Sequence, residues 1–138
     1  MSEILCDWRY IVRRVRNSPT FFHADGTVSS ALFKDSQGVS VDKDHMRSKE
    51  EVISDEERLH QFYYSVEEQK NNPGLKLMAL VKVNRDICDR NSITVIDDPI
   101  PEENLHHCLL FKNQEREKLS QQQAKALSSA VIILKKYS

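Results

Sequence analysis

The sequence predicts an α+β domain: a small mixed or antiparallel sheet of about four strands, packed by two or three helices that include one at the C-terminus. Segments rich in β-branched and aromatic residues are interspersed with segments whose apolar residues recur at helical spacing. No regular strand–helix–strand rhythm connects them, which favours α+β over α/β. A chain of 138 residues is long enough for one hydrophobic core, so we expect a single domain, 1–138.

The expected strands are short runs bounded by turn residues. The first covers residues 5–15, and Asn17, Ser18 and Pro19 end it, because proline lacks a backbone donor and the other two favour turns. Residues 75–83 alternate apolar side chains on one face, as a half-buried strand does. Further strands are expected at residues 38–41, 92–96 and 106–111.

Helix starts are indicated by serines that precede a glutamate by three residues. Ser48 with Glu51 and Ser54 with Glu57 match the spacing of a capping box. The second of these predicts a helix over residues 55–70, which Asn71-Asn72-Pro73-Gly74 would end. Residues 28–33 and 84–89 are expected to form helical turns. Apolar residues at helical intervals predict a last helix over residues 118–137.

Composition and the cysteines indicate a soluble protein of the cytoplasm. The chain is 39% hydrophobic and 30% charged, with a net charge of −1, and its first residues lack the basic start and long apolar run of a secretion signal. No segment is apolar over a membrane-spanning length, so we expect no membrane association. Cys6, Cys88 and Cys108 are odd in number and far apart, which favours buried free thiols over disulfides.

The N-terminal arginines could form a basic patch, but strand geometry divides them. If residues 8–16 are extended, Arg14 and Arg16 share one face while Arg9 and Arg13 share the other. The pattern therefore disfavours nucleic-acid binding.

The segment from Arg13 to Asp42 is the most distinctive part of the chain, because two of its three glycines, Gly26 and Gly38, lie there. Glycine allows backbone conformations closed to other residues and often marks a specifically shaped loop. Ser29-Ser30-Ala31-Leu32-Phe33, Gly38-Val39-Ser40-Val41-Asp42 and Asn104-Leu105-His106-His107-Cys108 follow one another along the chain. This order resembles a family of small uncharacterised bacterial proteins whose last loop often reads Asn-Pro-x-His-Ala; here Leu105 and Cys108 replace the proline and the alanine. The resemblance implies a bacterial cytoplasmic protein in which Arg13, Ser29, Ser40 and His107 cluster, and it implies no activity.

Two kinds of chemistry could use these residues. A catalytic site would draw on Arg13, Ser29, Ser40 and His107, but no nucleophile-elbow motif surrounds the serines. A nucleotide site would draw on Arg13 for phosphate, on serine hydroxyls such as that of Ser30 for hydrogen bonds and on Phe33 or Tyr10 for stacking, with Asp42 among its residues, although no Walker or dinucleotide motif is present. His106 and Cys108 share a strand face, but no paired Cys-x-x-Cys spacing completes a metal set. We expect neither a metal nor a cofactor.

These observations lead to two functional hypotheses. The first is a small non-enzymatic protein that acts by binding another protein, such as the product of a neighbouring gene; its motivation is a well-patterned fold without a complete catalytic set. The second is an enzyme or nucleotide-binding domain whose pocket is formed by Arg13, Ser29, Ser40 and His107. The second hypothesis requires these side chains to converge on one concave surface. The sequence leaves the oligomeric state open.

Overall fold

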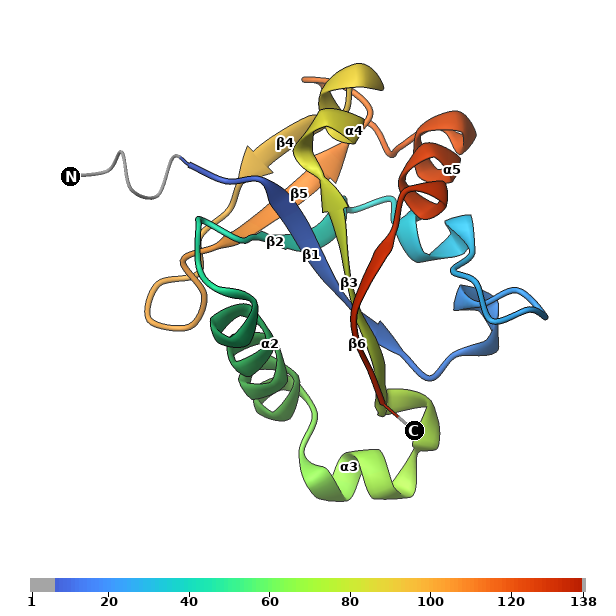
Figure 1. Cartoon of the computed structure of the whole chain (residues 1–138), viewed down its shortest axis with the longest axis vertical. Helices are drawn as coiled ribbons and strands as arrows, with labels where there is room; N and C mark the ends of the chain where they lie inside the picture. Colours follow the sequence, from blue (N-terminus) through green and yellow to red (C-terminus); the bar gives the residue numbers. More distant parts are fainter. Residues whose placement is uncertain (1–6, 138) are drawn as a thin grey trace.

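The computed structural model describes residues 7–137, which form one antiparallel sheet with helices on both faces (Figure 1). The six strands are ordered β4-β5-β2-β1-β3-β6. The strands are β1 (Tyr10–Arg16), β2 (Val39–Lys43), β3 (Leu77–Asn84), β4 (Thr94–Asp97), β5 (His107–Phe111) and β6 (Ile132–Lys136). The α+β class is confirmed, with six strands in place of about four. Residues 5 and 6 of the first expected strand lie outside the described residues.

Within residues 7–137, four α-helices and three short 3₁₀ turns connect the strands. They are α2 (Lys49–Tyr63), α3 (Val66–Asn71), α4 (Arg85–Arg90), α5 (Gln121–Ser129), η1 (Pro19–Phe21), η2 (Ser30–Phe33) and η3 (Pro73–Leu75). Figure 1 shows α2 and α5 on opposite sides of the central strands. The larger core lies on the α5 side, where Ile11 and Val15 of β1 belong to the same buried cluster as Leu32 of η2 and Leu127 of α5. Val12 points to the opposite face, which α2 covers with buried Val52 and Leu59.

The capping boxes decide where the helices begin. Ser48 caps α2 as expected: its hydroxyl accepts from Glu51 N–H, and the Glu51 carboxylate accepts from Ser48 N–H. The predicted start at Ser54 is wrong, because α2 is already helical there. The expected helix over 55–70 is instead divided at Ser65, which begins α3 with a capping box of its own.

The last helix is shorter than predicted, and a strand, β6, follows it. The helix α5 begins at the Ser120 cap and ends at Ser129, and β6 then pairs with β3. Val131, Ile132 and Ile133 are β-branched, which lowers their preference for a helix and raises it for a strand. The free edge of β3 provides the pairing partner that the sequence pattern alone did not indicate.

The sheet forks between its two central strands. Strand β1 pairs with β3 from Tyr10 to Arg16, but it pairs with β2 only at Ile11↔Lys43 and Val12↔Asp42. Beyond Val12, the second half of β1 and the first half of β2 diverge, while β2 remains paired with β5 as far as Val39. Side chains of several elements therefore meet in a gap within the sheet rather than above one of its faces.

Candidate functional site

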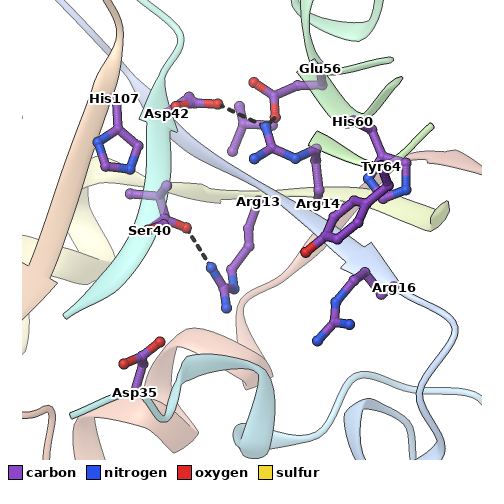
Figure 2. Close-up of a pocket in the computed structure, with 12 residues that line it drawn as sticks. Arg13, Arg14, Arg16, Asp35, Ser40, Asp42, Glu56, His60, Tyr64 and His107 are labelled. Carbon is purple, nitrogen blue, oxygen red and sulfur yellow. Dashed lines mark hydrogen bonds and ion pairs between the residues drawn. The ribbon is translucent and has the colours of Figure 1, made fainter. Parts of the chain in front are cut away.

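The fork holds a pocket with a volume of about 220 Å³ (Figure 2). Strands β1 and β2 supply most of its walls, α2 and the residue after it close one side, and β5 contributes one residue. The lining residues are Val12, Arg13, Arg14, Arg16, Asp35, Ser40, Val41, Asp42, Glu56, His60, Tyr64 and His107. Ten of the twelve carry polar side chains. The pocket is therefore suited to a polar or charged ligand.

Arg13 bridges the fork. Its Nε donates to the carbonyl oxygen of Leu32, 2.9 Å away, and its Nη1 donates to the carbonyl oxygen of Ser40. Figure 2 shows the second of these bonds crossing from β1 to β2. Burial and the neighbouring charge of Arg14 lower the pKa of Arg13 to about 10, so the guanidinium remains charged at neutral pH. A partly buried cation thus takes the place of the strand pairing that is missing here.

Two buried carboxyl groups lie against Arg14. Nη1 of Arg14 is 2.9 Å from Oε1 of Glu56 and 3.5 Å from Oδ2 of Asp42. Asn104 donates a hydrogen bond of 2.6 Å to the other Asp42 oxygen. Both carboxyl groups are almost entirely inaccessible to solvent, with Glu56 0% and Asp42 3% exposed.

The two carboxyl groups differ in protonation. Burial, reinforced by the negative charge of Asp42, raises the pKa of Glu56 well above its usual value. Burial acts in the same direction on Asp42, but the neighbouring Glu56 carboxyl group, the charge of Arg14 and the hydrogen bond from Asn104 outweigh it, so the pKa of Asp42 is lowered. Within residues 7–137, Oε2 of Glu56 is buried and has no hydrogen-bond partner. The raised pKa of Glu56 and the lowered pKa of Asp42 favour a proton on Glu56 and the negative charge on Asp42.

Two donors in the pocket are not engaged by the protein. Within the described part of the chain, the Arg16 guanidinium makes no hydrogen bond or ion pair and lies 6.0 Å from the centre of the Phe21 ring. The Tyr64 hydroxyl likewise has no hydrogen-bond partner there. Figure 2 shows this hydroxyl directed toward the space between Arg13 and Arg16. These two groups are the ones available to an incoming ligand.

His60 and His107 occupy two sides of the pocket. His60 donates from Nε2 to the Leu75 carbonyl oxygen at 2.8 Å, and burial lowers its pKa. His107 contacts Asp98 through Nδ1, at 3.0 Å from the carbonyl oxygen and 3.2 Å from Oδ2.

Three arginines face two ionised carboxylates, Asp35 and Asp42, so the pocket has an excess of positive charge when the histidines are neutral.

The pocket unites some of the residues singled out in the sequence and not others. Arg13, Ser40, Asp42 and His107 line it. Ser29 does not; its hydroxyl accepts from Ala31 N–H at 3.0 Å and caps η2. Ser30 lies in a separate groove beside α5, and Phe33, 1% exposed, packs in the core.

Sequence analysis missed Glu56, Arg14 and Tyr64 as parts of a site. Glu56 had a detectable signal, because it is four residues after Val52 and three before Leu59, on the buried stripe of α2. A carboxyl group at such a position indicates a buried partner. Tyr64 offered no comparable signal, since its position depends on where α2 ends.

Comparisons with family models, with curated proteins and with solved structures find no match for this chain. Among residues 7–137, no group of three or more His, Cys, Asp or Glu side chains is arranged to hold a metal ion. None of the helices in that range is both long and apolar enough to cross a membrane.

Proposed function

We propose that the protein binds a small phosphate-bearing ligand in the pocket between β1 and β2. The observation that carries this proposal is the presence of two unengaged donors, the Arg16 guanidinium and the Tyr64 hydroxyl, beside the partly buried charge of Arg13. Guanidinium groups and hydroxyls are suited to phosphate oxygens, and their bonds to an anion are stronger than those between neutral groups.

The size of the pocket limits what part of a ligand it takes. A volume of about 220 Å³ equals that of roughly seven liquid water molecules. A phosphate with an attached sugar suits this space, and the base of a nucleotide would lie outside it.

A thermal-shift titration with inorganic phosphate and with adenosine monophosphate, in a buffer free of phosphate, tests the proposal. A ligand that binds only the folded state raises its melting temperature in a concentration-dependent manner. Arg16→Ala and Tyr64→Phe should abolish or greatly reduce the shift, since each removes one unengaged donor. Arg90→Ala, on exposed α4, and Tyr63→Phe are the matched controls and should retain it. No shift in the native protein, or equal shifts in all variants, would contradict phosphate binding at this pocket.

Binding of a protein partner is the second candidate, and the connection between α2 and α3 favours it. Phe62 and Val66 are 60% and 69% exposed and lie four positions apart in the chain. Exposed apolar side chains of this kind contribute to protein interfaces. Affinity purification from the native host with the native chain and with Phe62→Asp/Val66→Asp distinguishes the outcomes: a partner recovered only by the native chain supports this surface, and equal recovery by both, or no partner, contradicts it.

A further inference from the structure

The contact between His107 and Asp98 determines which nitrogen of the imidazole carries its proton. Nδ1 of His107 is 3.0 Å from the carbonyl oxygen of Asp98, and an oxygen of this kind only accepts hydrogen bonds. Nδ1 must therefore be the donor, which leaves Nε2 with a free electron pair in the neutral ring. The Asp98 carboxylate, 3.2 Å from Nδ1, is a second acceptor for the same N–H and helps to fix the orientation of the ring.

The other nitrogen remains available to the pocket. Nε2 of His107 has no hydrogen-bond partner within residues 7–137, although the side chain is only 14% exposed. His107 is directly opposite Asp42 in the β2–β5 register, so both side chains project from the same face of the sheet. His107 is one of the residues that line the pocket, and Figure 2 shows its ring near Ser40. A histidine with a solely structural role does not require this free nitrogen.

The arrangement has the parts of a general-base site. A base needs a free electron pair within a ligand pocket, and a third group that fixes its tautomer and orientation. His107 and Asp98 supply these parts. The donors Arg13, Arg16 and Tyr64 lie in the same pocket, where they can stabilise the negative charge that develops on a phosphoryl group during transfer.

We propose that this pocket hydrolyses phosphate esters, with His107 as the general base and Asp98 as a positioning residue. The inference rests on the proposed phosphate binding. Nε2 accepts a proton from a water molecule as that oxygen forms a bond to phosphorus. The bond between phosphorus and the ester oxygen breaks on the opposite side, where the departing oxygen takes a proton from solvent, and Nε2 of His107 releases its own proton to solvent. The products are a phosphate and an alcohol, and the imidazole returns to its neutral form.

The test measures hydrolysis of p-nitrophenyl phosphate and bis(p-nitrophenyl) phosphate by the native chain and by variants purified in the same way. His107→Ala should lower kcat by about 100-fold or more without changing KM, because general-base catalysis contributes 10²–10⁴-fold. Added imidazole should restore part of the lost rate. Asp98→Asn should lower kcat by about tenfold with KM unchanged, since its carbonyl oxygen still fixes the tautomer. His23→Ala, on an exposed turn, is the matched control and should leave both constants unchanged.

The two experiments distinguish failure of ester hydrolysis from failure of phosphate binding. If phosphate binds in the thermal-shift titration but the native chain hydrolyses neither ester faster than His107→Ala, the hydrolase inference is overturned and phosphate binding stands. If phosphate does not bind, both proposals fail. Circular dichroism and melting temperature show whether His107→Ala folds; if it does not, His107→Gln takes its place, and a rate equal to that of the native chain overturns the role of His107. A native rate in Asp98→Asn overturns the role of Asp98.

Discussion

His45 and His106 face each other with their Nδ1 atoms 2.7 Å apart, so the two imidazoles share one proton between them. One ring must donate from Nδ1 and the other accept at Nδ1, so at least the accepting ring is neutral. Burial, together with the charges of Lys43 and Arg47, lowers the pKa of His45. Burial, Arg47 and His45 lower the pKa of His106 to about 4.

Because of this pair, we expect the protein to become less stable as the pH is lowered. In the unfolded chain a histidine takes up a proton near pH 6.5, but folded His106 resists doing so until about pH 4. The contribution is therefore fully present above pH 6.5 and is lost as the pH falls from 6.5 to 4. The slope from His106 cannot exceed about 1.4 kcal/mol per pH unit. Urea unfolding between pH 7 and pH 4 should show a shallower decline in His106→Asn; identical slopes would contradict the prediction.

The two carboxyl groups beside Arg14 should show strong non-additivity. Either Asp42→Asn or Glu56→Gln leaves one carboxyl group that can ionise and balance Arg14, so each single variant should lose only about 1–2 kcal/mol of unfolding free energy. The double variant leaves the partly buried Arg14 cation without a counter-charge. It should therefore lose at least about 1 kcal/mol more than the sum of the single losses. Urea unfolding of the four proteins measures this, and additive losses would show that the carboxyl groups act independently.

Gly38 and Gly26 should respond differently to substitution by alanine. Both have positive φ angles, +96° and +86°. A Cβ at Gly38 would be 2.6 Å from Cζ of Phe111, whereas nothing lies within 4 Å of a Cβ at Gly26. Gly26→Ala should cost about 1 kcal/mol from backbone strain alone. Gly38→Ala should cost about 2–4 kcal/mol, because the Phe111 ring must also move. Equal losses in denaturant unfolding would indicate that the ring moves freely.

The buried thiols should be unreactive in the folded protein. Cys88 and Cys108 are both 0% exposed, and burial raises the pKa of each thiol, that of Cys88 to about 12. A thiolate is the reactive form, so neither residue should react with a disulfide reagent at pH 8 until the protein opens. In a Cys6→Ser background, labelling should be at least about 100-fold slower than in urea. Rapid labelling of the folded protein would contradict the packing around these residues.

Local sequence signals predicted the elements that are determined by neighbours in the chain. The Ser48 capping box, the turn after Ser29 and the alternating strand that becomes β3 all depend on residues a few positions apart. The predicted helix over residues 118–137 failed because its second half depends on a distant edge of β3. The helical spacing of the apolar residues predicted a helix there, but pairing of β6 with β3 makes the segment a strand.

The pocket could be predicted only in part, for the same reason. Arg13, Ser40 and His107 were identified as candidates because of their residue types and the segments around them. That they meet depends on where β1 and β2 stop pairing, which no local pattern indicates. Ser29 belongs to the same family of motifs, yet its hydroxyl is used by η2. The sequence indicated which side chains have suitable chemistry, whereas only the tertiary structure showed which of them meet in one pocket.

The fork between β1 and β2 divides the sheet into two three-stranded halves, β4-β5-β2 and β1-β3-β6. At the open end of the fork, the Arg13 bond to Ser40 links them. A ligand that drew the guanidinium away from that carbonyl oxygen would remove this cross-link and let the halves change their mutual angle. Ligand binding in the pocket would then change the relative positions of the two edge strands, β4 and β6, which the ligand does not contact.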